Sequence, residues 1–220
     1  PKDSLSGKAI EKTITRFGTE SNTIYWRYLN DNSMIIYGIG EMKKYTESQR
    51  SEWNQYNNLC QRITIDEYIT TIGSYSFMGF NKLKTITIPT TVTTIGEYIL
   101  RQCTSLTSIS VDKNNKQYSS DSNGVLYHTE MKTLIQYPLG KEDNEYNIET
   151  GINTIESYAF EQAQQLESIT IANDVHTIKE KAFESISTLK TVTIGSSVQT
   201  IGEYAFRYCN SLNSISVTEG

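Results

Sequence analysis

The chain has 220 residues, enough for one or two domains with a substantial buried core. Its net charge of −5 and the lack of any basic run argue against a nucleic-acid partner, because neutralising phosphates requires clustered lysines and arginines. No run of about 18 apolar residues occurs, so the sequence predicts no membrane-spanning helix.

Residues 1–58 do not repeat, and we expect them to form an N-terminal cap rich in β-structure. Ile24–Tyr28 and Met34–Ile39 consist largely of β-branched and aromatic residues, which predicts two short strands. Asn30–Asn32 lies between them and favours a turn. The sequence therefore predicts a β-hairpin.

The rest of the cap contains Ser48–Tyr56, which predicts a short helix. Trp26 and Trp53 could serve as ligand platforms. We expect them instead to plug the open end of the repeats that follow, because the first coil of a repeat protein needs a cap.

Residues 59–220 are organised around a repeat of fixed period. A leucine recurs at spacings of 106−83 = 23, 189−166 = 23 and 212−189 = 23, and the remaining gap of 166−106 = 60 is 23 plus 37. Self-similarity at a fixed period of about 20–50 residues is typical of a solenoid. A solenoid also suits the low hydrophobic content of 37%, because each coil buries only a thin inner row. The repeated leucines are Leu83, Leu106, Leu166, Leu189 and Leu212.

Each unit begins with a half-buried strand. In the unit 83–105, isoleucines alternate with threonines over 85–88, which is the period-two pattern of a strand with one buried face. A second apolar pair within 92–95 predicts another short extended segment on the opposite flank of the coil.

A short polar–apolar segment, called here the turn segment, completes each unit. It is too short for a free helix, so we expect one helical or 3-10 turn held by packing. Its recurring phenylalanine is expected to stack on the equivalent ring of the next coil. Its recurring tyrosine is expected to form a partly buried row on the convex side, rather than a recognition ladder. The phenylalanines are Phe77, Phe160, Phe183 and Phe206, with Leu100 as the departure, and the tyrosines are Tyr75, Tyr98, Tyr158 and Tyr204.

Residues 112–147 interrupt the repeat. Gly124–Tyr127 and Thr133–Tyr137 predict a hairpin. Val111 and Ile148 occupy the same strand position, at a separation of 148−111 = 37. We therefore expect this hairpin insertion to project from the stack without breaking it.

No residue pattern for catalysis or for a cofactor occurs, which predicts a non-enzymatic protein with no cofactor and no metal. His128 and His176 have no partner at metal-ligand spacing, and Asp143–Glu145 lacks the pattern of a calcium-binding loop. Cys103 and Cys209 occupy the same repeat position in coils about 14 Å apart, too far for a disulfide. They and Cys60 are expected to be buried core thiols.

The repeat resembles the BspA-like class of leucine-rich repeats, whose pattern is L-x-x-I-x-I-P-x-x-V-x-x-I-G-x-x-A-F-x-x-C-x-x. The match covers residues 60–220; Ile99–Leu100 replaces Ala–Phe, and Glu156 and Lys179 stand where glycine is usual. Residues 24–65 and 112–147 resemble the lead-in and the recurrent insertion of the same family. The pattern is carried by Leu83, Ile86, Ile88, Pro89, Val92, Ile95, Gly96 and Cys103, and by Leu189, Val192, Ile194, Val198, Ile201, Gly202, Ala205, Phe206 and Cys209.

The resemblance implies an α/β leucine-rich-repeat solenoid: a right-handed horseshoe dominated by β-strands, with short helical or 3-10 turns. It also implies an extracellular or cell-surface protein of a host-associated bacterium or protist. The implied function is adhesion to host proteins or to other cells.

The leading functional hypothesis is a binding module that uses the β-face, the outward side chains of the first strand of each unit. This nearly uncharged, hydroxyl-rich row would suit a protein or glycan ligand, although threonine also simply favours strands. Alternatives are a structural spacer in a longer surface protein and, less favoured because leucine-rich horseshoes curve and serines break the rows, ice binding by Thr-x-Thr rows. The β-face residues are Arg62, Thr64, Thr85, Thr87, Ser108, Ser110, Ser168, Thr170, Thr191, Thr193, Ser214 and Ser216.

The last strand, Leu212–Val217, is followed by no residues that could cap the solenoid. We expect the natural protein to continue with further repeats or a cap. We also expect end-to-end self-association of this segment through the exposed strand edge.

Overall fold

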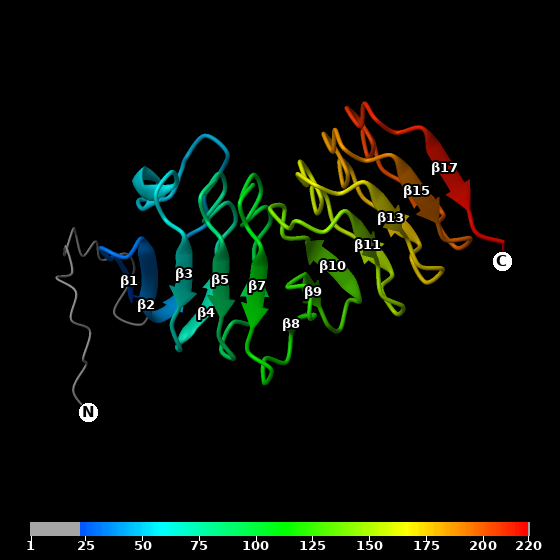
Figure 1. Ribbon diagram of the computed structural model, residues 1–220. Coiled ribbons are helices and arrows are strands. Elements are labelled where there is room, and N and C mark those ends of the chain that lie inside the picture. Colours follow the sequence, from blue (N-terminus) through cyan, green and yellow to red (C-terminus); the bar gives the residue numbers. More distant parts are fainter. Residues whose placement is uncertain (1–22, 220) are drawn as a thin grey trace.

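The computed structural model describes residues 23–219 and shows a β-solenoid, with the chain wound into successive coils from one end to the other (Figure 1). Residues 1–22 of the expected cap, together with Gly220, lie outside the described residues. Within 23–219 there is no α-helix, and the one helical element is a 3-10 helix, η1 (Asn54–Tyr56). This is shorter than the helix predicted over Ser48–Tyr56.

The strands form three sheets. The first contains β1 (Thr23–Tyr28), β2 (Ser33–Glu41), β3 (Arg62–Ile65), β4 (Ile69–Ile72), β5 (Thr85–Ile88), β6 (Thr94–Ile95) and β7 (Ser108–Val111). The second contains β8 (Tyr118–Ser120), β9 (Leu126–His128), β10 (Thr133–Gln136), β12 (Thr154–Ile155), β14 (Thr177–Ile178) and β16 (Thr200–Ile201). The third contains β11 (Glu145–Asn147), β13 (Ser168–Thr170), β15 (Thr191–Ile194) and β17 (Ser214–Val217).

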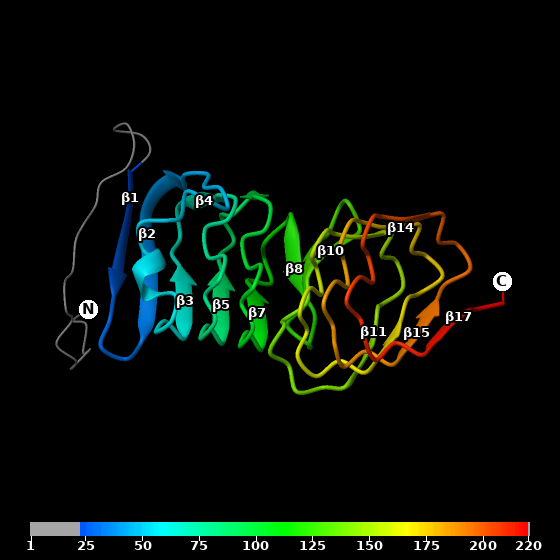
Figure 2. The same cartoon turned by 90° about the horizontal axis from the view of Figure 1, so that it is seen from above.

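Each coil contributes strands to two opposite flanks. Figure 2 shows β3, β5, β7, β11, β15 and β17 along one side of the solenoid, and β4, β10 and β14 along the other. Equivalent strands of neighbouring repeats pair in parallel with a shift of one repeat period, as in Ile63↔Ile86 and Ile86↔Ile109. The period therefore fixes the register, because a slip by a single residue would turn the isoleucines out to solvent.

The N-terminal hairpin forms as predicted: β1 and β2 pair antiparallel through the turn at Asn30–Asn32. β2 covers both flanks of the first coil, because its beginning pairs with β3 and its end pairs with β4. Trp26 and Trp53 are 2% and 1% exposed, so both lie in the core. The Trp53 indole donates to the Ser76 carbonyl at 2.9 Å. They plug the end of the solenoid and offer no ligand platform.

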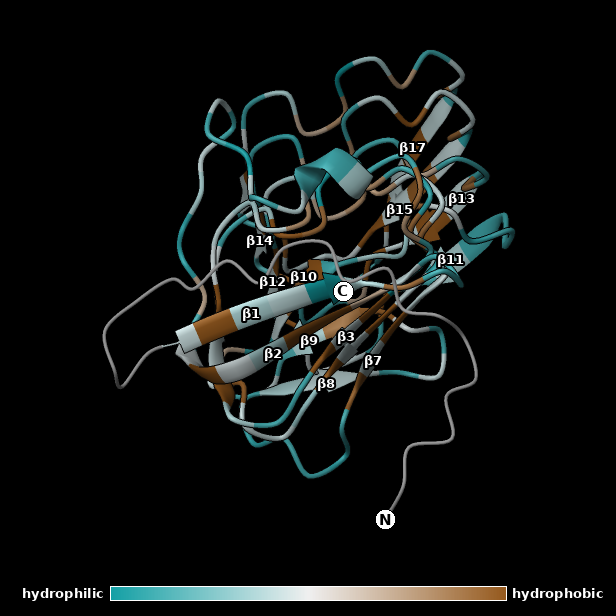
Figure 3. Cartoon of the chain, turned by 90° about the vertical axis from the view of Figure 1, so that its left-hand side faces the viewer, coloured by the Kyte–Doolittle hydropathy of each residue, from teal (hydrophilic) through white to brown (hydrophobic). Residues whose placement is uncertain are grey.

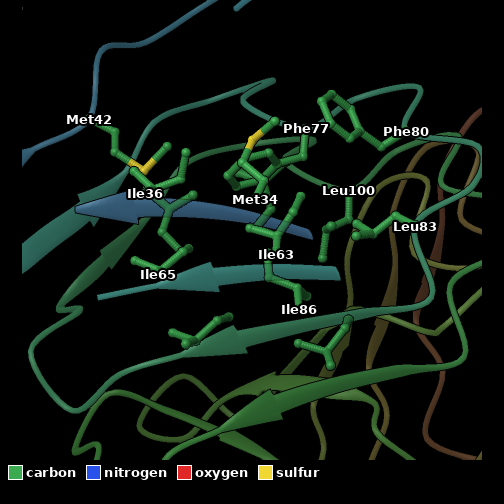
Figure 4. Close-up of a cluster of buried hydrophobic side chains, with 14 of the residues drawn as sticks. Met34, Ile36, Met42, Ile63, Ile65, Phe77, Phe80, Leu83, Ile86 and Leu100 are labelled. Carbon is green, nitrogen blue, oxygen red and sulfur yellow. The ribbon is translucent and has the colours of Figure 1, made fainter. Parts of the chain in front are cut away.

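The core is a set of columns that run along the solenoid axis. Figure 4 shows the first part, in which isoleucines of β2, β3 and β5 face Phe77 and Leu100 of the turn segments. Seen along the axis, hydrophobic colour lies mainly on the strands and hydrophilic colour on many of the outer turns (Figure 3). Phe183 has no exposed surface and stacks between Phe160 and Phe206, with ring centroids 4.9 and 5.1 Å away, as predicted.

The cysteines are buried and unpaired with one another, as expected. The Cys103 thiol donates to the carbonyl of Phe77, and the Cys209 thiol donates to that of Phe183. In each case the acceptor belongs to the preceding coil. These contacts join consecutive coils.

The turn segments consist of successive hydrogen-bonded turns rather than a helix. Each has two residues in the left-handed region, four apart, such as Lys181 (φ 55°) and Ser185 (φ 61°). Their N–H groups donate to the carbonyls of Glu203 and Arg207 in the next coil, at 3.0 and 2.8 Å. A helical turn would direct these groups along its own axis, so hydrogen bonding between coils offsets the cost of positive φ, about 1–3 kcal/mol per residue. The other pairs are Tyr75 and Gly79, Tyr98 and Gln102, Tyr158 and Gln162, and Tyr204 and Tyr208.

The expectation that residues 112–147 project from the stack without breaking it is wrong. The hairpin of β9 and β10 is present, but Leu126 and Leu134 have no exposed surface and Tyr137 is only 1% exposed. β10 pairs in parallel with β12, and β11 pairs in parallel with β13. These residues therefore complete a coil of the solenoid.

We call residues 125–147 the divergent coil. The gap between Leu106 and Leu166 holds two repeat periods and a remainder of 60−23−23 = 14. The divergent coil pairs with the next coil at an offset of 154−133 = 21 in β10 and of 168−145 = 23 in β11. Within the divergent coil, the register of β10 with β9 is irregular. Its strand β11 does not pair with β7, so the first and third sheets are separate.

Candidate functional site

The twelve β-face residues lie on β3, β5 and β7 of the first sheet and on β13, β15 and β17 of the third, and none is buried. They do not form one continuous face, because the divergent coil lies between the two sheets. We call the two groups the first patch and the second patch. The first patch is Arg62, Thr64, Thr85, Thr87, Ser108 and Ser110, and the second is Ser168, Thr170, Thr191, Thr193, Ser214 and Ser216.

Within each patch the side chains form straight rows set by the strand register. In the second patch, Ser168 pairs with Thr191 and Thr191 with Ser214. The hydroxyl of Thr191 donates to that of Ser168 at 2.9 Å. In the first patch the one charged member, Arg62, is paired with Asp31 at 2.6 Å. Both patches therefore present uncharged hydroxyl groups in a fixed spacing.

The tyrosines of the turn segments form a partly exposed row, as expected. The rings of Tyr75, Tyr98 and Tyr158 contact in sequence, with centroids 5.1 Å apart at each step. Lys181 takes the next position, and its amine lies 3.0 Å from the Tyr158 hydroxyl. Tyr204 is 51% exposed. These contacts join neighbouring coils, so the tyrosine row is explained by packing between coils.

A cavity of about 270 Å³ lies where the divergent coil joins the preceding repeats. Beside it Arg101 donates through Nε and Nη2 to both carboxylate oxygens of Glu161, at 2.7 and 2.9 Å, and lies 3.9 Å from the Tyr158 ring centroid. The Glu161 side chain is 5% exposed, so this is a nearly buried ion pair. The cavity lies away from both patches and was not expected.

The sequence contains one signal for this junction. Arg101, Glu161, Glu184 and Arg207 occupy the same repeat position, and their charges in chain order are positive, negative, negative and positive. Arg101 pairs with Glu161, and Arg207 pairs with Glu184. Arg101 and Glu161 are 161−101 = 60 residues apart, the same separation as Leu106 and Leu166. This opposite charge at one repeat position could have indicated that the two turn segments lie side by side.

A polar cluster joins two tyrosines of the divergent coil to Asp121, which precedes it. The hydroxyls of Tyr127 and Tyr146 are 2.6 Å apart, and both lie within 3.2 Å of Asp121 Oδ2. Burial raises the pKa of both tyrosines, so these groups stay protonated and hydrogen-bonded. Residues 23–219 contain no group of three His, Cys, Asp or Glu side chains placed to hold a metal ion. Nor does this part of the chain contain a helix of the length and hydrophobicity needed to span a membrane.

The coils, strand register and recurring leucines define a leucine-rich-repeat solenoid, a class of repeat module associated with protein interaction and typically without enzymatic activity. The chain belongs to the family described as the BspA type leucine rich repeat region. Six copies of that repeat match, over residues 51–135 and 141–220. No curated protein matches the chain.

Solved structures of leucine-rich-repeat proteins have the same fold. One is a leucine-rich repeat protein from Eubacterium ventriosum, with 23% identity over 90% of this chain and 70% of that one, at a TM-score of 0.58. Another is the pneumococcal vaccine antigen PcpA, with 16% identity over 94% of this chain and 82% of that one, at a TM-score of 0.55. At these identities the similarity establishes the fold.

Proposed function

We propose that this chain is a non-enzymatic adhesion module of a secreted or cell-surface protein, and that it binds a protein partner through the β-face. In this proposal residues 1–58 cap a repeat domain of residues 59–220. The observation that carries the proposal is the pair of patches: twelve outward residues on parallel strands, in register and not buried, with hydroxyl groups on all but one.

The chemistry of the patches supports protein contact over recognition of a charged polymer. The single arginine is paired, and threonine and serine hydroxyls can both donate and accept hydrogen bonds. Many such contacts on a rigid scaffold cost little conformational entropy on binding. The similarity to a vaccine antigen, together with the family, supports a place at the cell surface.

A panel of purified extracellular host proteins, tested for binding to the immobilised chain, examines the proposal. Thr87→Arg in the first patch and Thr191→Arg in the second place a bulky charge on exposed positions. Thr200→Arg, on exposed β16 of the opposite flank, is the matched control.

We expect at least one panel protein to bind, and at least one patch variant to weaken that binding about tenfold, or about 1.4 kcal/mol. The control should bind as the parent chain does. Absence of binding to the whole panel would favour a structural spacer. An equal loss of affinity in the control would mean that the binding surface is not the β-face.

A further inference from the structure

The ladder of N–H···O=C hydrogen bonds between turn segments is interrupted at the cavity. The N–H groups of Tyr75 and Gly79 donate to the carbonyls of Glu97 and Arg101 in the next coil. One coil later, the equivalent N–H group of Tyr98 donates to no group within residues 23–219. Tyr98 lines the cavity, so the broken ladder leaves a backbone donor beside it.

The lining of the cavity also contains an acceptor. Gln136 is 5% exposed and lines the cavity. Its amide nitrogen donates to the carbonyls of Tyr137 and Ala159, both at 2.9 Å, which fixes the orientation of the side chain. The Gln136 amide oxygen accepts no hydrogen bond from the described residues. Hydroxyl groups of a ligand, which can both accept and donate, would match this donor and this acceptor.

Both cations around the cavity are already paired with carboxylates. Its lining includes two carboxylates and two cations, Glu97, Glu156, Arg101 and Lys179. Lys179 pairs with Glu156 at 2.5 Å, and Arg101 pairs with Glu161. An anionic ligand would therefore find no free cation, and a cationic ligand would meet only Glu97, which is exposed to solvent, while either would lose its own hydration. The site therefore suits a neutral ligand.

Aromatic and aliphatic groups make up much of the remaining lining. Tyr98, Tyr118 and Tyr158 line the cavity together with Ile99 and Ile135. Such rings can pack against the C–H groups of a ligand, while the Tyr98 N–H and the Gln136 amide oxygen can bind its hydroxyl groups. The volume of about 270 Å³ lies just below the roughly 300–1,000 Å³ of drug-sized ligand sites. One small ring would fill it.

We propose that this cavity binds a single neutral sugar residue, either free or at the end of a glycan. No residue of the two patches lines it. The sugar site is therefore independent of the proposed protein-binding β-face, and each can be present without the other.

Saturation-transfer NMR on the whole chain tests the proposal with glucose, galactose, mannose and N-acetylglucosamine as probes. Glucosamine and N-acetylneuraminic acid are charged comparators. Ser157→Trp places a large side chain in the lining of the cavity. Glu203→Trp is the matched control, because residue 203 occupies the same repeat position two coils later and is exposed.

We expect at least one neutral sugar to bind in the millimolar range, with affinity at least about tenfold lower in Ser157→Trp and unchanged in Glu203→Trp. Thr87→Arg and Thr191→Arg should leave sugar binding unchanged. The proposal is overturned if no neutral sugar binds, if a charged comparator binds in preference, or if the two tryptophan variants lose binding equally.

Discussion

Tyr137 stacks on Phe160, with ring centroids 4.9 Å apart and ring planes at 21°. Tyr137 precedes Phe160 by one repeat period, so it adds one ring to the column formed by Phe160, Phe183 and Phe206. The divergent coil, which has Asp143 at the position of the recurring leucine, thus keeps a core position of the repeat.

The phenylalanine column is expected to carry much of the packing energy between coils. Phe183→Ala removes a ring with no exposed surface, so the free energy of unfolding should fall by about 3–5 kcal/mol. Thr191→Ala, on the exposed β-face, should change it by less than about 0.5 kcal/mol. Urea unfolding of both variants measures the difference, and equal shifts of the midpoint would be incompatible with this column.

Two tyrosines of the divergent coil should respond in opposite directions to loss of their hydroxyl. The Tyr137 hydroxyl is buried without a partner, so Tyr137→Phe should keep or raise stability, by about 1 kcal/mol. The Tyr146 hydroxyl bonds to Tyr127 and Asp121, so Tyr146→Phe should cost about 0.5–1.5 kcal/mol. Thermal unfolding of the pair provides the comparison; a stability loss in Tyr137→Phe would show that its hydroxyl has a partner in solution.

The buried thiols make the fold sensitive to alkaline pH. Burial raises the pKa of Cys60 and of Cys103 to about 12, whereas an unfolded thiol titrates near about 8.5. Between these values the folded state holds more protons than the unfolded state, so stability is complete below about pH 8.5 and falls as pH rises towards 12. Buried tyrosines such as Tyr137 act in the same direction.

Urea midpoints at pH 8, 9.5 and 10.5 measure this slope, which should be shallower in Cys103→Ala. At pH 8 a thiol reagent should label the cysteines only after urea is added. Rapid labelling of all three in native buffer would contradict their burial.

The strand β17 is expected to mediate end-to-end association of this segment. Its Ile215 and Val217 are 54% and 66% exposed, and its outer edge pairs with no other strand within residues 23–219. Edge strands of this kind pair with other chains unless a charge prevents it. Light scattering should show association that rises with concentration and is reduced by Ile215→Lys. A monomer at every concentration, with or without the substitution, would refute the prediction.

The regular repeats could be predicted because hydrophobic period and strand register are local properties. Leu83, Phe183 and Cys103 occupy their positions for reasons visible within a single repeat of the sequence. The left-handed residues of the turn segments could not be found this way, because Tyr75 and Lys181 adopt positive φ only when the next coil accepts their N–H groups. The sequence period shows the spacing of such residues but not their backbone conformation.

The divergent coil escaped prediction for a related reason. Its core side chains, such as Leu126 and Tyr146, come from an antiparallel hairpin and a short strand rather than from the leucine-isoleucine pattern of the other repeats, and its offset to the next coil differs between β10 and β11. The cavity could not be predicted either, because its lining residues come from separate parts of the chain that only the fold brings together. In the sequence, only the opposite charges of Arg101 and Glu161 at one repeat position indicated that their two turn segments are in contact.

The division of the β-face and the cavity both depend on the divergent coil being part of the core. Leu134→Ala tests this most directly, with Met131→Ala as the control, because Leu134 has no exposed surface and Met131, in the hairpin turn just before it, is 68% exposed. We predict that urea unfolding will show a loss of about 2–5 kcal/mol for Leu134→Ala and less than about 0.5 kcal/mol for Met131→Ala. Equally small losses in both variants would mean that the hairpin projects from the solenoid.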